Sequence, residues 1–257
     1  MKISVELSHV CSLSDIPDHA AAIEENGFHR VWAPDTLVSP WDAWLAADLV
    51  AHYTSRVNIG LGVTNPFTRH PMVTAQMAAT LQAVSDGRLA LSVGKGIGRL
   101  LEKAGISTHP RAVEECIHIL RGLISGKRVT FQGEFFRIDH IQLRTIPPEK
   151  AVPIYMAAVG PESWKKAVNT ADGIETIWSD QTAGIKQRTM KESPLPTAAL
   201  VPFSLAEEAF FPNTLGSFKE LAYAADRMNR SRFDEMIIAY RDLGDLACAR
   251  EIIDTYG

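Results

Sequence analysis

The chain has 257 residues, three cysteines and a formal net charge of −4, with a sequence pI near 6.1. This length is typical of one α/β barrel domain, and the charge gives no electrostatic basis for binding nucleic acid or an anionic membrane. Cys11, Cys116 and Cys248 are widely spaced, which indicates neither a disulfide framework nor a zinc site. No apolar run approaches the roughly 18 residues of a membrane span, and the first residues show no signal-peptide core. We therefore expect a soluble cytoplasmic protein.

Short β-rich runs alternate with longer segments of helical period, which predicts βα units around a parallel sheet. Seven strands are predicted, at residues 3–8, 30–33, 57–63, 89–93, 153–157, 173–177 and 198–203. Helices are predicted at roughly 16–26, 41–53, 72–84, 111–125 and 162–170. A hairpin or loop excursion is expected within residues 127–144, and residues 204–211 read as a further helix start that Ser204 would cap.

Seven strands are one fewer than a closed (β/α)8 barrel requires. Residues 236–240 are a candidate for the eighth strand, while residues 246–256 have a helical pattern, after which the sequence stops. The fold class expected is therefore a single α/β domain over residues 1–257, like a (β/α)8 TIM barrel, which either closes through residues 236–240 or has a missing or altered final strand.

Residues 59–71, IGLGVTNPFTRHP, are the most informative stretch. Two glycines weaken a strand, so they indicate a sharp bend or a close approach to the backbone. Asn65-Pro66 ends the strand, because proline donates no ladder hydrogen bond and restricts the residue before it. Small polar groups thus gather at the carboxyl end of a buried strand, where α/β barrels bind their ligands, although an ordinary βα turn fits the same spacing.

Five segments support a more specific interpretation: MKISVE at 1–6, EENGFHRVWAPD at 24–35, GVTNPFTRHP at 62–71, SDGRLALSVGKG at 85–96 and VPIYMAAVGP at 152–161. In this order and spacing, and followed by ADG at 171–173, they resemble the luciferase-like barrel superfamily. The resemblance is closest to the methylenetetrahydromethanopterin reductases that use the deazaflavin coenzyme F420. It covers about residues 1–180, weakens over 181–232, and implies a homodimer. Family members usually run some tens of residues longer, with a final strand after the last helix.

Glu6 is the candidate catalytic residue. It lies in an apolar strand, where a carboxylate that points into a barrel is costly to bury ionised, so that its pKa rises and suits proton transfer. Strand residues alternate, so Glu6 and Ser4 line either a polar cavity or a solvated face. The resemblance implies the cavity, with Glu6 exchanging the proton as an imidazolidine-like ring opens.

The resemblance also implies a cofactor site. Asp35 would lie near the coenzyme ring or ribityl chain, Thr64 and Asn65 would hydrogen-bond the pyrimidine edge, and a cis bond at Gly62-Val63 would support the ring. Simple turns or caps are the alternatives at these positions. The phosphate and anionic tail would bind at two glycine-containing turns, each of which is otherwise a bare βα turn. The residues of these turns are Gly94, Lys95, Gly96, Ala158, Gly160 and Pro161.

Other residues have a structural interpretation. Asp86 and Arg88 precede a strand, at the stabilising end of a barrel, and His70 is expected to cap a helix. Trp41 and Trp44 belong either to the core or to a substrate lid. The charges in residues 186–191 are interpreted as a solvated helix face, and the histidines do not have metal-ligand spacing.

Three functions follow. The first is an F420-dependent oxidoreductase that transfers a hydride between reduced F420 and a small electrophilic substrate, plausibly methylenetetrahydromethanopterin or a related pterin. The second is an FMN-dependent monooxygenase on the same barrel, because Lys95 and the Gly160 turn suit FMN phosphate equally well. The third is a non-catalytic barrel that binds a ligand or a partner, motivated by the uncertain final strand. No metal is needed in any of them.

Overall fold

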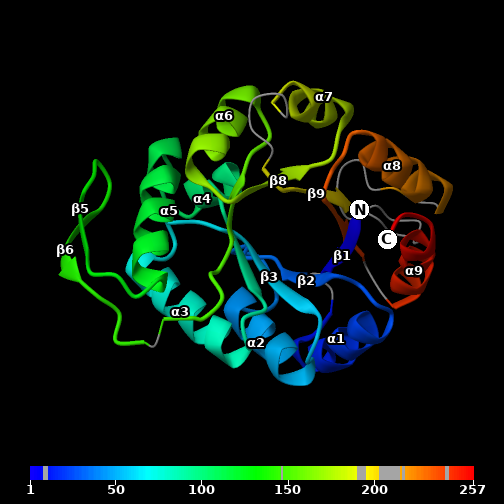
Figure 1. The fold of residues 1–257 in the computed structure, drawn as a ribbon, viewed down its shortest axis with the longest axis horizontal. Coiled ribbons are helices and arrows are strands. Elements are labelled where there is room, and N and C mark those ends of the chain that lie inside the picture. Colours follow the sequence, from blue (N-terminus) through cyan, green and yellow to red (C-terminus); the bar gives the residue numbers. More distant parts are fainter. Residues whose placement is uncertain (8–10, 146, 190–194, 203–214, 216–217, 241–242) are drawn as a thin grey trace.

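The computed structural model describes residues 1–7, 11–145, 147–189, 195–202, 215, 218–240 and 243–257. Eight parallel strands close into a barrel in the order β1-β10-β9-β8-β7-β4-β3-β2 (Figure 1). These strands are β1 (Lys2–Glu6), β2 (Arg30–Ala33), β3 (Asn58–Thr64), β4 (Leu89–Val93), β7 (Ile154–Ala157), β8 (Gly173–Ile177), β9 (Thr197–Pro202) and β10 (Glu235–Ala239).

Helices surround the barrel on its outside (Figure 1). They are α1 (Ile16–Glu25), α2 (Ala43–Tyr53), α3 (Pro71–Val84), α4 (Gly98–Lys103), α5 (Pro110–Ile124), α6 (Pro161–Thr170), α7 (Asp180–Thr189), α8 (Phe218–Arg230) and α9 (Leu243–Tyr256), with a short 3-10 helix η1 (Leu13–Asp15) before α1. The start of α3 follows the sequence prediction, because the His70 side chain accepts a hydrogen bond from Met72 N at 3.2 Å. Asp42 caps α2 in the same way, from Trp44 N at 2.9 Å.

The eighth strand is the candidate at residues 236–240, so the alternative of a missing or altered final strand is wrong. β10 pairs with β1 along its whole length, from Lys2 with Glu235 to Glu6 with Ala239, and with β9 on its other side. Its short apolar sequence, EMIIA, left helix and strand open. Burial on both faces explains why this strand shows no alternation of apolar and polar residues.

The other predicted elements lie within a few residues of the observed ones. The excursion at 127–144 is an antiparallel hairpin of β5 (Val129–Gln132) and β6 (Arg137–Ile141), which extends away from the barrel beyond α5 (Figure 1). Its turn is held by the Glu115 carboxylate, which accepts backbone N–H groups of residues 134–136. The helix start predicted at 204–211 and the ends of the first and last predicted strands, Ser8 and Phe203, lie outside the described residues.

Lys186 shows that the prediction of a solvated face over 186–191 is wrong at its first residue. Its side chain is 1% exposed. The ammonium donates to Thr197 Oγ1 at 2.6 Å and to Asp234 Oδ2 at 3.2 Å, so it ties α7 to the starts of β9 and β10. A tertiary contact of this kind leaves no mark in the local charge pattern, and the side chains of residues 187–191 lie outside the described part of the chain.

The barrel interior is filled by alternate residues of the strands. One buried cluster there consists of Trp32, Ala90, Tyr155, Ala198 and Ile237. Glycines make room for the rings, because a Cβ atom on Gly60 would lie 2.2 Å from Trp32 Cδ2, and one on Gly173 would lie 2.5 Å from Tyr155 Cε1. The interior is therefore closely packed below the carboxyl ends of the strands.

We expect Gly60→Ala to destabilise the protein by about 1–3 kcal/mol, because the added methyl group overpacks the barrel against the indole of Trp32. Urea unfolding measures the change. Gly98→Ala is the matched control, since its Cβ would make only ordinary contacts at 3.6 Å with the flexible Lys95 side chain. Equal effects of the two substitutions would contradict the role given to Gly60.

Candidate functional site

Glu6 points into the barrel. The side chain is 7% exposed, and Ser4, two residues earlier on the same face of β1, donates from Oγ to Glu235 Oε1 at 2.6 Å. Strand alternation allowed Glu6 to face either a polar cavity or solvent, and in the structure Glu6 faces the barrel interior. Glu6 is the last residue of β1, so its carboxyl lies toward the carboxyl ends of the strands.

An ion pair lies at the opposite end of the barrel. Arg30 Nη1 donates to Glu235 Oε2 at 2.5 Å, and Trp32 Nε1 donates to Oε1 at 2.9 Å. Burial alone would raise the pKa of Glu235, but the guanidinium of Arg30 and the two neutral donors hold it below its ordinary value. Glu235 is therefore a fixed anion whose charge is already matched.

Within the described residues, neither Glu6 nor Glu175 forms an ion pair of this kind. Burial, and then the charge of Glu175, raises the pKa of Glu6 from 4.5 to about 8. Burial also dominates at Glu175, on β8, and raises the pKa of this carboxyl to about 7. Both values lie near neutrality, which is where a group must titrate to give or take a proton efficiently. Sequence analysis did not find Glu175, although its inward position follows from the strand alternation after Gly173.

Asp35 lies in a network that connects the loops after β2 and β3. Thr64 Oγ1 donates to Asp35 Oδ2 at 2.6 Å, and Arg69 Nη1 donates to both carboxylate oxygens at 2.9 and 2.8 Å. Arg69 also pairs with Asp42, the cap of α2. The sequence prediction included Asp35 and Thr64 but missed Arg69, which fixes the orientation of the Asp35 carboxylate. The available signal in the sequence was that Asp35 and Arg69, which have opposite charges, lie in adjacent βα loops.

The loop after β3 has the close approaches that its glycines predicted. The Gly62-Val63 peptide bond is cis, as the resemblance implied. A Cβ on Gly62 would lie 2.5 Å from Ser92 Cβ, and one on Gly94 would lie 2.6 Å from Val63 Cγ1. Asn65 is 5% exposed, and its Oδ1 accepts from Phe67 N, Thr68 N and Thr68 Oγ1. The Asn65 carbonyl therefore holds the turn, and its amide Nδ2 lies toward Gly96.

The two glycine-containing turns follow β4 and β7. Lys95 is exposed and Gly96 has a positive φ of 72°. Gly160 is the N-cap of α6, with Pro161 as the first helical residue and no side chain capping the helix. Nothing lies within 4 Å of a Cβ placed on Gly160, and the preceding Ala158 is buried. The first turn of α6 therefore presents backbone N–H groups to open space, which suits an anion.

The predicted site residues thus come from β1 and from the loops after β2, β3, β4 and β7, which all reach the barrel mouth at the carboxyl ends of the strands. Trp41 and Trp44 are both buried, which favours core packing for these side chains. Asp86 and Arg88 lie before β4. Arg88 donates to backbone carbonyls of Ala51, Thr54 and Val57, in agreement with its structural interpretation.

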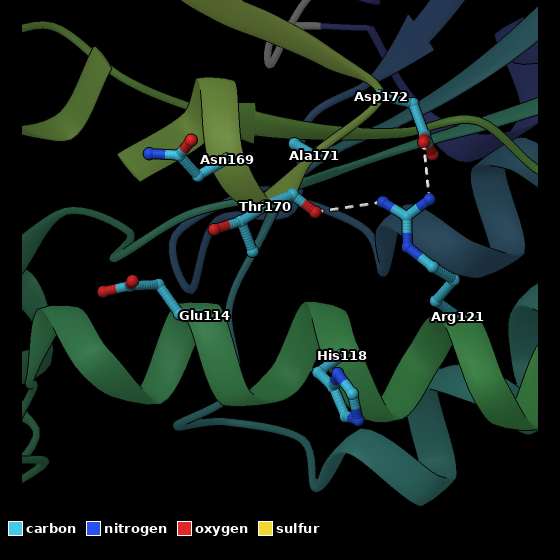
Figure 2. Close-up of a pocket in the computed structure, with 7 residues that line it drawn as sticks. All are labelled: Glu114, His118, Arg121, Asn169, Thr170, Ala171 and Asp172. Carbon is cyan, nitrogen blue, oxygen red and sulfur yellow. Dashed lines mark hydrogen bonds and ion pairs between the residues drawn. The ribbon is translucent and has the colours of Figure 1, made fainter. Parts of the chain in front are cut away.

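A pocket of about 510 Å³ lies on the outer wall between α5 and the loop after α6 (Figure 2). Arg121 donates to Asp172 Oδ1 at 2.6 Å and to the carbonyl of Thr170 at 3.0 Å. Glu114, on the same helix, pairs with Lys166 at 2.6 Å. Because these charged groups already have partners within the protein, the pocket is a weaker candidate for a ligand-binding site than the barrel mouth.

Two further observations concern the described residues. Within them, no three His, Cys, Asp or Glu side chains lie close enough together to hold a metal ion. The helices in this part of the chain are also too short or too polar to span a membrane.

Comparisons with known proteins agree with this geometry. A family model described as luciferase-like monooxygenase matches residues 2–190. The F420-dependent hydroxymycolic acid dehydrogenase of Mycobacterium tuberculosis is 34% identical over 244 residues, which are 87% of this chain and 66% of that protein. The 5,10-methylenetetrahydromethanopterin reductase of Methanolobus tindarius is 29% identical over 206 residues, 76% of this chain and 62% of that protein. The chain thus spans less than two thirds of the length of these relatives.

A solved structure shows the same fold. The coenzyme F420 dependent tetrahydromethanopterin reductase from Methanopyrus kandleri superposes with a TM-score of 0.83. The superposition covers 100% of this chain and 99% of that chain, at 17% sequence identity. At this identity the likeness supports the closed barrel architecture.

The raised pKa of Glu6 predicts a specific dependence of stability on pH. A carboxyl with a folded-state pKa of about 8 binds more protons than the unfolded chain above pH 4.5, so its contribution to stability is lost as pH rises toward 8. Glu6→Gln removes this loss. We expect the variant to match the parent near pH 5 and to exceed it by roughly 3 kcal/mol near pH 9.

Urea unfolding of the two proteins at both pH values checks this difference. Glu251→Gln, at an exposed position on α9, is the control for loss of a carboxyl charge. A difference between parent and Glu6→Gln that stays constant with pH would show that Glu6 is ionised in the folded protein.

Proposed function

The chain belongs to the luciferase-like monooxygenase family, and from this premise we propose that it is an F420-dependent oxidoreductase. The reaction proposed is hydride transfer between reduced F420 and a small electrophilic substrate. The observation that carries the proposal is the Glu6 carboxyl, buried at the mouth of the barrel with a pKa near neutrality. The names of two relatives support it, since one is called F420-dependent and the other a methylenetetrahydromethanopterin reductase.

The residues at the barrel mouth fit a deazaflavin coenzyme. Gly62 packs against Ser92, and Gly94 packs against Val63 and Ala157, which fixes the backbone at the carboxyl ends of β3 and β4, where the flat ring would lie. The Asp35 carboxylate and the Asn65 amide lie in the adjoining loops, where they can bind polar atoms of the ring and its chain. The uncapped start of α6 at Gly160 and the exposed Lys95 suit the phosphate and the anionic tail.

When bound, reduced F420 supplies a hydride from its deazaflavin ring. The chain supplies orientation and a proton. Arg69 and Thr64 hold Asp35 in one position, which limits the freedom of a ligand that binds it. Glu6 is protonated at neutral pH and can therefore donate a proton to a leaving nitrogen atom, in surroundings that the barrel wall keeps dry.

We propose methylenetetrahydromethanopterin or a related pterin as the substrate. Opening of the imidazolidine-like ring of such a substrate needs one hydride at carbon and one proton at nitrogen. A protonated carboxyl beside a hydride donor meets this need. The homodimer, the cytoplasmic location and the single domain over residues 1–257 that the sequence predicted stay predictions.

Cofactor choice is tested by fluorescence titration of the purified protein with F420 and, in parallel, with FMN. We expect F420 to bind more tightly. Asp35→Asn and Lys95→Ala should each weaken F420 binding by about tenfold, which corresponds to the loss of one charged contact. Arg111→Ala, an exposed cation that pairs with Glu134 beside the hairpin, is the control for loss of positive charge. Preference for FMN would indicate a monooxygenase, and binding of neither would indicate a non-catalytic barrel.

The role of Glu6 is tested by steady-state kinetics of Glu6→Gln with F420 and the pterin. We expect kcat to fall by about a hundredfold or more, because a general acid is lost, while the Kd for F420 changes little. Unchanged turnover in a variant that still binds F420 would remove Glu6 from the mechanism.

A further inference from the structure

The barrel interior holds a second carboxyl, Glu175, that the proposed reaction leaves without a role. We infer that Glu6 and Glu175 form a coupled pair of carboxyls that holds two protons when the reaction starts, with Glu175 as the positioning residue that passes its proton to Glu6. The inference rests on the proposed function for the use of that proton. The existence of the pair stands on the structure of the barrel alone.

The strand register places Glu175 in the interior. Within β8, Glu175 pairs with Ala157 of β7 and with Ala198 of β9. Ala198 belongs to the cluster of side chains that fill the barrel, and it pairs in turn with Glu235 of β10. Glu175 thus shares its face of the sheet with Glu235 and Glu6 in the barrel interior.

Within the described residues, the Glu175 carboxyl forms no ion pair, and one of its oxygens has no donor. It is 5% exposed, and within the described residues its Oε2 has no hydrogen-bond donor. The buried Ser92 hydroxyl, on β4, lies close enough to this carboxyl to lower its pKa, but burial has the larger effect. A buried polar atom left unpaired costs free energy, so a carboxyl in this position is stabilised by keeping a proton.

The nearby charges explain why the two carboxyls act together. Arg30 is the cation that lowers the pKa of Glu175, but its guanidinium already forms an ion pair with Glu235. Glu235 remains an anion and disfavours a second charge at Glu175, which in turn disfavours a charge at Glu6. Like charges in a shared dry site cannot both ionise readily, so the protons leave in separate steps that belong to the pair.

This arrangement gives Glu6 a local proton supply. After Glu6 gives its proton to the substrate nitrogen, the O–H bond at Glu175 breaks and a new O–H bond forms at Glu6. The negative charge moves from Glu6 to Glu175, and no electrons are exchanged. Solvent then returns one proton to the pair.

Infrared spectroscopy of the protein without cofactor tests the pair, because a protonated carboxyl has its own carbonyl band. The band is followed against pH for the parent, Glu6→Gln, Glu175→Gln and the double variant. We expect two steps in the parent and one in each single variant. The remaining Glu6 step should lie about one pH unit lower in Glu175→Gln, since its anionic neighbour is gone.

A Glu6 step that does not move in Glu175→Gln would overturn the inference. Glu251→Gln gives the effect of removing an exposed carboxyl, and Glu175→Ala provides a second variant if the glutamine variant does not fold. Because no cofactor is present, this result stands whether or not F420 binds.

Kinetics then separates positioning from packing. In Glu175→Gln we expect the pH profile of kcat to shift in the same direction as the Glu6 step, while KM stays unchanged. If Glu175→Asp restores the pH profile of the parent, the carboxyl group itself is what this position requires. A uniform fall of kcat at every pH would show a structural role only.

Discussion

The ion pair of Arg30 with Glu235 determines the electrostatics of the whole barrel. Three carboxyls, from Glu6, Glu175 and Glu235, lie in one dry interior, and the guanidinium of Arg30 neutralises the deepest of them. Burying an ion pair is stabilising only when its remaining donors and acceptors find partners. Ser4 and Trp32 provide these for Glu235, whereas Arg30 Nε has no hydrogen-bond partner within the described residues.

The consequence appears at the other two carboxyls. Glu175 and Glu6 are buried without a cation of their own, and burial raises the pKa of both carboxyls toward neutrality or above it. The position of each glutamate in the barrel therefore decides whether its carboxyl is ionised or protonated. The same chemical group is a fixed anion where a cation meets it and a proton donor where none does.

The sequence predicted the architecture well where the local pattern is strong. The glycines of 60–62, the Asn65-Pro66 stop and the Pro161 helix start each have one physical explanation, and each was observed. Tertiary partners were harder to predict. Arg69 and Lys186 look like surface cations in their own segments, and only the barrel brings them to Asp35 and Asp234.

Glu175 was missed for a related reason. In GIETI the glutamate reads as the polar position of a half-exposed strand, whereas closure of the barrel turns that face inward. The eighth strand was only a candidate, because a short apolar run such as residues 236–240 has no alternation that identifies a strand. The direction of a side chain in a barrel depends on closure, which no single segment determines.

The pairing of β1 with β10 also has a consequence for synthesis of the chain. Ser4 and Glu235, joined by a hydrogen bond across these strands, are 231 positions apart in the sequence. A ribosome needs roughly 10–50 s to add that many residues, and during this time β1 has no partner on one edge. An unpaired strand edge invites pairing with other chains. The barrel is therefore most exposed to misassembly while it is being translated, before its last strand has emerged.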